Sequence, residues 1–301
     1  MANYEIIGAG QDTARRAPKK NTINYGDSAE VLKLIESKSI DMILTSPPYD
    51  DMRLYNGYVF RFETIAIEIY RILKEGSVLV WVVGDQTKDG NESGSSFEQA
   101  LFFKSIGFKL HDTMIYEKAN GAMGSKNHYL QCFEYMFVFT KGKIKTVSLL
   151  RDRKNVRSGT ESALKHGRKK DGSLPSRKMV TMQEYGRRKN IWKYGVGGGK
   201  TGHPAVFPEK LAQDHIISWS KEGDLVLDPF CGSGTTCLMA ALNGRNYIGI
   251  DTDLDYRVMA EKRIEERIHA LRSPAQDIME ICHTAPNSGR DAIPQQVEMG
   301  L

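Results

Sequence analysis

One short run of residues has the composition of a pocket for a planar amine. Ile40–Thr45 is an apolar run typical of a buried strand, and Ser-Pro-Pro-Tyr follows it directly at 46–49. The two prolines have a fixed φ and no N–H, so they hold the chain extended and rigid beyond the strand. A ring-attached amine could donate to the Ser46 hydroxyl and to the carbonyls of Ser46 and Pro47, while Tyr49 stacks on the ring. The lone pair of the amine would then face an electrophile.

A second run, Asp-Pro-Phe-Cys-Gly-Ser-Gly-Thr-Thr at 228–236, has the form of a nucleotide-cofactor loop. Leu225–Asp228 predicts a buried strand, two glycines follow, and Thr235–Leu242 predicts a helix. Glycines let the backbone approach a ligand, and the N–H groups of a helix start point at it. Residues 247–251 predict the next strand, which ends in Asp251, about 20 residues beyond the glycines, where an acid meets ribose hydroxyls.

The same loop excludes two common nucleotide sites. It lacks the third glycine of the dinucleotide fingerprint because Cys237 follows Thr236, and no lysine follows Gly234 as in a phosphate-binding loop. An adenosine attached to an amino acid suits it better than a pyrophosphate. A dinucleotide oxidoreductase would explain the strand–glycine–helix unit but would leave residues 46–49 without a role.

A third glycine run, at 197–201, is not a nucleotide site. A Walker A motif would need a glycine at position 194, where this chain has Tyr194. The preceding residues 187–193 are too basic for a buried strand. We therefore expect this segment to be a flexible connector.

Together the two motifs resemble those of the exocyclic-amine DNA methyltransferases. Residues 46–49 are similar to their catalytic motif and 228–234 to their cofactor motif, in the order of the group called β. Gly26-Asp27 upstream and the segment 203–210 also resemble that group. The match covers roughly residues 22–140 and 200–272.

The resemblance implies S-adenosylmethionine as the cofactor and a base flipped out of double-stranded DNA as the substrate. It places the cofactor's adenosine near Phe230 and Asp251, and its methionine end near Asp228 and the segment 203–210. The implied catalytic residues are Ser46, Pro47, Pro48 and Tyr49, and the implied cofactor-binding residues are Asp27, His203, Pro204, Phe207, Lys210, Asp228, Pro229, Phe230, Gly232, Gly234, Thr235, Thr236 and Asp251.

The target base and the partners stay open. Ser46, in place of the commoner Asp, favours cytosine N4 in this family, and adenine N6 is the alternative. An RNA methyltransferase and a catalytically silent DNA-binding module are further alternatives. The resemblance also allows a homodimer, with residues 60–73 as an interface face or as core, and a cognate restriction endonuclease.

Composition narrows the class of protein. The chain has no run of 18 apolar residues and no signal-peptide core at its start, so we expect a cytoplasmic protein. The four cysteines lack Cys-x-x-Cys spacing, which disfavours a metal or disulfide framework. Carbon methylation of cytosine would need a Pro-Cys nucleophile, and the chain has no such pair.

Charge is concentrated in one interval. Residues 141–200 contain 18 Lys and Arg against 4 Asp and Glu, a local charge of +14, while the whole chain is only +5. A strongly basic insert on a moderately acidic body is the pattern of polyanion binding. The target-recognition region of the resembled family lies in this interval.

The chain order predicts an α/β fold, a doubly wound and mostly parallel sheet of the Rossmann-like methyltransferase type. We expect a flexible arm at 1–21, a catalytic half at 22–140, the basic target-recognition insert at 141–200, a cofactor-binding half at 201–272 and a polar tail at 273–301. Within them, residues 60–73 and 254–271 predict helices, and 77–83 and 133–139 predict strands. In the second helix, Leu254, Val258, Ile264, Ile268 and Leu271 recur at helical intervals as its covering face.

Overall fold

The fold is built around one eight-stranded sheet. A computed structural model describes residues 17–48, 60–119, 127–163, 171–173, 179–196 and 208–272. The strands run in the order β1-β14-β13-β2-β3-β7-β6-β12. Their bounds are β1 Thr22–Tyr25, β14 Asn246–Asp251, β13 Leu225–Asp228, β2 Ile40–Thr45, β3 Leu73–Val83, β7 Phe133–Thr140, β6 Lys109–Lys118 and β12 Ile191–Tyr194.

Most neighbouring strands are parallel. The first five strands in this order, from β1 to β3, pair with one another in parallel. Strand β7 is antiparallel to both of its neighbours, β3 and β6. The edge strand β12 is again parallel to β6. The predicted doubly wound, mostly parallel sheet is confirmed, with an antiparallel portion on one side.

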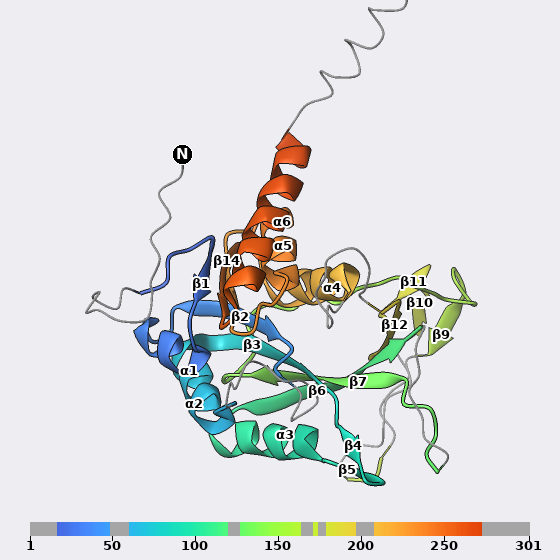
Figure 1. Cartoon of the computed structure of the whole chain (residues 1–301). Helices are drawn as coiled ribbons and strands as arrows, with labels where there is room; N and C mark the ends of the chain where they lie inside the picture. The colour runs from blue at the N-terminus through green and yellow to red at the C-terminus, as the bar shows by residue number, and fades with distance from the viewer. Residues whose placement is uncertain are drawn as a thin grey trace, which may run out of the picture.

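Helices cover both faces of the sheet (Figure 1). One apolar core lies under α4 Glu209–Trp219, α5 Thr235–Leu242 and α6 Leu254–Arg272. The other lies under α1 Ser28–Val31, the short helix η1 Leu32–Leu34, α2 Phe62–Ile72 and α3 Ser95–Ser105. In the described parts of the chain, no helix is long and apolar enough to span a bilayer.

Helix α2 uses its apolar positions for the core. Its buried residues Ile65, Ala66, Ile69 and Ile72 recur at the spacing of one helix face and pack against the sheet. The sequence left these apolar positions open to a dimer interface or to the core, and in the structure they lie in the core. Ile67, at 52% exposure, is not part of that face.

Helix α6 is only partly the covering helix that we predicted. Ala260 and Ile264 are buried, but Leu254, Val258 and Leu271 are about half exposed or more. The helix projects away from the sheet (Figure 1), and its buried apolar residues lie in its middle. The five-residue covering face is therefore wrong at these three positions.

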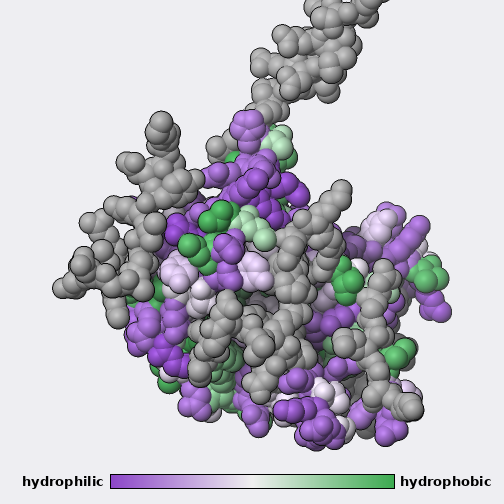
Figure 2. All heavy atoms as spheres, in the orientation of Figure 1, coloured by the Kyte–Doolittle hydropathy of each residue, from purple (hydrophilic) through white to green (hydrophobic). Residues whose placement is uncertain are grey.

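The basic insert contains short strands at one end of the sheet. β8 Arg153–Lys154 pairs with β11 Tyr185–Gly186, and β9 Glu161–Ala163 pairs with β10 Met179–Thr181. Hydrophilic residues gather over this lobe (Figure 2). A further hairpin, β4 Thr87–Lys88 and β5 Asn91–Glu92, follows β3.

The connector predicted at the glycine run 197–201 lies outside the described residues. The prediction that residues 187–193 are too basic for a strand is wrong for residues 191–193. Ile191–Tyr194 forms β12 on the edge of the main sheet, and the Trp192 ring is buried there. The Trp192 ring packs on His215 of α4, with ring centroids 4.6 Å apart. A single large apolar side chain thus outweighs the basic residues around it. The predicted domain boundaries otherwise stay predictions.

Candidate active site

The two predicted motifs meet because β2 and β13 are neighbours in the sheet. Met42 lies opposite Val226 and Ile43 opposite Leu227 in a parallel pair, so both strands end at the same edge. The Thr45 hydroxyl donates a 2.6 Å hydrogen bond to Asp228 Oδ1 across 183 residues of chain. Carboxyl ends of parallel strands are the usual ligand-binding edge of an open α/β sheet.

A second bond joins the motifs from the helix side. Thr236, in the first turn of α5, donates from Oγ1 to the carbonyl of Leu44 at 3.2 Å. The strand that leads into residues 46–49 is therefore bound to both ends of the glycine loop. A shift of one motif would move the other.

The catalytic motif starts where the prolines predict. Strand β2 ends at Thr45, and the next two residues lie outside regular structure, with Ser46 half-buried and Pro47 buried. Pro48 is half-buried as well. Tyr49 lies outside the described residues, so its predicted stacking role stays a prediction.

The backbone of the glycine loop is held at several points. Ser28 donates from Oγ to the carbonyl of Pro229, and Cys231 N–H donates to Ile250 O at 3.0 Å. Gly232 N–H donates to Asp251 Oδ2 at 2.7 Å. The loop is thus preorganised by β14 and by the start of α1.

Asp251 lies where an acid for a ribose is expected, at the end of β14. It also accepts a 2.8 Å bond from Asp253 N–H, so each carboxylate oxygen has one backbone donor. A carboxylate has about four acceptor positions, so Asp251 can still accept from a ligand hydroxyl. Burial raises the pKa of Asp251 above its usual value, although the side chain is only half-buried.

Asp27 caps the first helix beside this acid. Its Oδ1 accepts from Ala29 N–H at 2.9 Å, and Arg61 pairs with its Oδ2 at 2.5 Å. The preceding Gly26 N–H donates to the Asp251 carbonyl at 2.8 Å. The structure therefore brings Asp27 to the same sheet edge as the loop, and its cofactor-binding role stays a prediction.

The two glycines of the loop adopt a backbone conformation that other residues rarely take. Both have positive φ, +47° at Gly232 and +77° at Gly234. A Cβ on Gly234 would lie 2.8 Å from the Cβ of Ala260 in α6. Gly234 therefore serves the close packing of α6 on the loop.

Asp228 is deeply buried at the start of the loop, whereas Phe230 is half-buried. The Phe230 ring packs edge-on against Phe60 at 5.5 Å, and its N–H donates to Asp228 Oδ1 at 3.1 Å. Asp228 itself is 1% exposed. Burial raises its pKa to about 6, against the opposing effect of the bonds from Thr45, Phe230 and Thr236.

Arg263 was missed by sequence reasoning. From α6 its Nη1 donates to Ser233 O at 2.9 Å and to Thr235 Oγ1 at 3.1 Å. Its Nη2 pairs with Glu209 Oε1 at 2.7 Å, at the first residue of α4. One guanidinium thus holds the glycine loop and the end of the segment 203–210. The sequence offered one signal for it: Arg263 directly precedes Ile264, a residue on the predicted core-facing side of the helix.

Lys210 lies at the start of α4 in a polar cluster around Asp214. Its Nζ donates to Asp214 Oδ1 at 2.7 Å, while Tyr194 and Arg188 Nη1 donate to Oδ2 at 2.6 and 2.7 Å. Burial opposes ionisation of Asp214, yet these donors hold its pKa below the usual value. His203, Pro204 and Phe207 lie outside the described residues.

The two cysteines of the loop region are packing residues. Cys231 and Cys237 are buried, and burial raises the pKa of both thiols well above the usual value. A Cβ on Gly249 would lie about 3 Å from each sulfur. Neutral thiols in such a position fill space.

The fold and the joined motifs define a Rossmann-like methyltransferase of the amine type. A family model described as DNA methylase matches residues 40–262, most of the chain. The orphan methyltransferase M.BamHII of Bacillus amyloliquefaciens is 54% identical over 239 residues, which cover 76% of this chain and 90% of that protein. The chain belongs to the N4/N6 DNA methylase family, as the resemblance implied.

Other relatives carry names with different target bases. The DNA adenine methyltransferase YhdJ of Escherichia coli is 27% identical over 86% of this chain and 88% of its own. The structure of the cytosine-N4-specific PvuII DNA methyltransferase matches with a TM-score of 0.61 and 19% identity, over 85% of this chain and 94% of that one. At that identity the second match shows the fold alone.

Proposed function

We infer that this protein transfers a methyl group from S-adenosylmethionine to the exocyclic amine of a base in double-stranded DNA, with cytosine N4 favoured over adenine N6. The observation that supports this most is the Thr45–Asp228 bond, since it brings the amine motif and the cofactor motif to one sheet edge. An enzyme that aligns two reactants gains much of its rate from that positioning.

The residues present fit the proposed cofactor. Asp251 retains acceptor positions for ribose hydroxyls, and the Gly232–Asp251 bond holds the loop open at positive φ. Arg263 donates to the loop carbonyl of Ser233, and Asp228 accepts from the N–H of Phe230 at the start of the loop. When bound, S-adenosylmethionine supplies an electrophilic methyl group. Lys210 is less suited to a direct contact, because its ammonium is paired with Asp214.

The same edge offers a place for the base. Ser46 directly follows the end of β2, one residue beyond Thr45 with its bond to Asp228. Pro47 and Pro48 restrict the backbone after it. A base within a duplex cannot reach such a recessed position, so it must be flipped, which costs a few kcal/mol of unstacking. Hydrogen bonds to Ser46 and Pro47 and stacking on Tyr49 offset part of that cost. The departing proton goes to Ser46 or to solvent.

The partners are part of the same proposal. The insert at 141–200 contacts the DNA, and the protein acts in the cytoplasm, where a bacterial chromosome or plasmid is accessible. A homodimer and a cognate restriction endonuclease stay predictions. The 54% identical relative is named an orphan methyltransferase, which favours an enzyme without a nuclease partner.

Methyl-labelled S-adenosylmethionine and unmethylated genomic DNA test the proposal directly. After digestion to nucleosides, mass spectrometry should find the label in N4-methylcytosine. Label in N6-methyladenine would keep the mechanism and reverse the base. Label in RNA alone would overturn the DNA substrate, and no transfer by a protein that binds the cofactor would favour a silent binder.

A further inference from the structure

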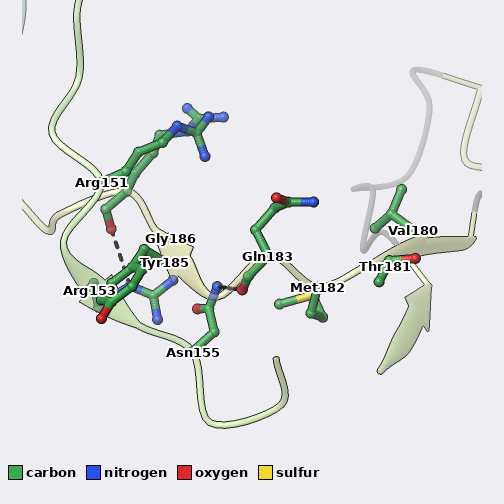
Figure 3. Close-up of a pocket in the computed structure, with 10 residues that line it drawn as sticks. Arg151, Arg153, Asn155, Val180, Thr181, Met182, Gln183, Tyr185 and Gly186 are labelled. Carbon is green, nitrogen blue, oxygen red and sulfur yellow. Dashed lines mark hydrogen bonds between the residues drawn. The ribbon is translucent and has the colours of Figure 1, made fainter. Parts of the chain in front are cut away.

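A hollow of about 550 Å³ opens on the basic insert, and none of its lining residues belongs to the two motifs of the candidate site. It is formed by the β8–β11 pair and by the chain between β10 and β11. Figure 3 shows Arg151 and Gln183 extending their side chains to the same side of the backbone. Three of its ten lining residues are arginines, at 151, 153 and 187.

The backbone holds one of these arginines in a defined place. Arg153 lies opposite Gly186 in the antiparallel pair, and its Nε donates to the Arg187 carbonyl at 3.2 Å. A Cβ on Gly186 would lie 2.4 Å from Arg153 Nη2. The guanidinium therefore lies flat across β11 in the space that the glycine leaves.

The charge of the hollow is uncompensated. Arg151, Arg153 and Arg187 are exposed, and none of them forms an ion pair within the described parts of the chain. The neighbouring carboxylate of Asp152 is bound by Arg188, whose side chain turns inward to Asp214. Planar guanidinium groups without a carboxylate partner suit the phosphates of a nucleic acid backbone.

Gln183 adds a group of a different kind. Its backbone carbonyl accepts a 2.8 Å bond from Asn155 Nδ2, which fixes where the side chain starts. The side-chain amide is exposed and makes no hydrogen bond among the described residues. A glutamine amide can bond both N6 and N7 of adenine in the major groove.

We propose that this hollow is a DNA-contact site in which Arg151, Arg153 and Arg187 bind backbone phosphates and Gln183 reads a base edge. The proposal rests on the DNA substrate proposed above. It assigns positioning to the arginines and sequence preference to the glutamine, as phosphate and base contacts divide these tasks in protein–DNA interfaces.

Binding to a fluorescent genomic duplex, measured at several salt concentrations, tests the arginines. Each of Arg151→Ala, Arg153→Ala and Arg187→Ala should weaken binding roughly tenfold. Each should also lower the slope of log affinity against log salt by about 1. Lys262→Ala on α6, a basic residue with a side chain 74% exposed, is the matched control and should change neither quantity. Unchanged affinity and slope in all three arginine variants would overturn the proposal.

Two more variants separate the roles within the hollow. Gly186→Ala should displace the Arg153 guanidinium and reproduce the loss seen in Arg153→Ala without lowering the melting temperature. Gln183→Ala should leave the salt slope unchanged and reduce the preference for the native base at one position of the methylated site about tenfold, read by sequencing modified positions. An unchanged site preference would refute the assignment of Gln183.

The wild-type protein distinguishes failure of this inference from failure of the proposed function. Methylation of DNA by wild-type protein together with normal binding by the arginine variants would refute only the hollow. Tighter wild-type binding to an RNA duplex, dependent on the same arginines, would refute DNA as the partner of the hollow.

Discussion

Two buried aspartates in different regions, one at the junction with the insert and one at the cofactor loop, behave in opposite ways. Asp214, at the junction of α4 with the insert, is fully buried but receives bonds from Lys210, Tyr194 and Arg188. Asp228, at the start of the cofactor loop, is equally buried, and its donors among the described residues are hydroxyls and a backbone N–H. The first keeps a lowered pKa, and the pKa of the second rises to about 6.

The difference shows how each region is held together. Cationic partners offset the desolvation of Asp214, so its charge can tether the insert to the core. Among the described residues, no cation pairs with Asp228, and its position is fixed by hydrogen bonds from Thr45 and Phe230. The junction therefore depends on ion pairing, and the loop depends on packing and directional hydrogen bonds.

Breaking the ion pair at the junction should have the largest effect. We expect Arg188→Ala to destabilise the protein by about 3 kcal/mol, because a buried carboxylate loses a partner while Lys210 and Tyr194 remain. Urea unfolding measures the change. The neighbouring Arg187→Ala, which removes an exposed arginine, should leave stability within about 0.5 kcal/mol. Equal losses in the two variants would contradict the comparison.

The raised pKa of Asp228 should make protein stability depend on pH. With its pKa raised from 3.8 to about 6, folded Asp228 holds a proton between these values that the unfolded chain releases. The contribution of Asp228 to stability should therefore fall as pH rises from about 4 to about 6, by an amount on the order of 3 kcal/mol. Asp228→Asn should lack this fall and be the more stable protein at pH 8. Buried His215 acts in the opposite direction in both proteins, because burial lowers its pKa to about 3 and only the unfolded chain holds its proton in this range.

Unfolding curves at pH 4.5 and pH 8 check this expectation. Asp251, whose pKa is also raised, contributes in the same direction in both proteins, so the difference between them isolates Asp228. Asp214 acts with the opposite sign because its pKa is lowered in the folded state. Its stabilising contribution is present above the pKa of the unfolded chain and is lost as the pH falls through the folded pKa. Parallel pH profiles for wild type and Asp228→Asn would refute the assignment.

Removing the amine acceptor should affect turnover and spare the cofactor. We expect Ser46→Ala to lower turnover about 100-fold, the usual cost of one positioned polar group in a catalytic site, with cofactor affinity unchanged. Tyr49→Ala should behave in the same way. Single-turnover methylation and calorimetric cofactor titration measure the two quantities, and equal loss of cofactor binding in both variants would remove them from the catalytic role.

The smallest effect is expected at Arg263, a positioning residue behind the loop. Arg263→Met should weaken cofactor binding about tenfold through loss of the bonds to Ser233 and Thr235, while DNA affinity stays the same. Arg267→Met is the matched control, since within the described residues that side chain pairs with Glu209 and not with the loop. A fall in melting temperature without a change in cofactor affinity would assign Arg263 to stability alone.

Local signals predicted much of the fold. The bounds of β2, β13 and α5 agree with the sequence because apolar runs, prolines and glycines act over a few residues. Strand β12 was missed since its one buried ring, Trp192, is surrounded by basic residues and finds its partner, His215, only in the folded state. The exposed positions of α6 were also missed, because periodicity does not show how far a helix extends beyond the elements it packs against.

The sequence by itself determined the chemistry of this protein: an amine motif, a cofactor loop, their order and a basic insert. Only the tertiary structure decided that Thr45 bonds Asp228, that Arg263 holds the loop to α4, and that Arg188 faces inward while Arg187 faces outward. Residue types and short spacings define which atoms can react or bind. Contacts between distant segments depend on strand order and on which side of the backbone each side chain leaves, and neither is written in local sequence.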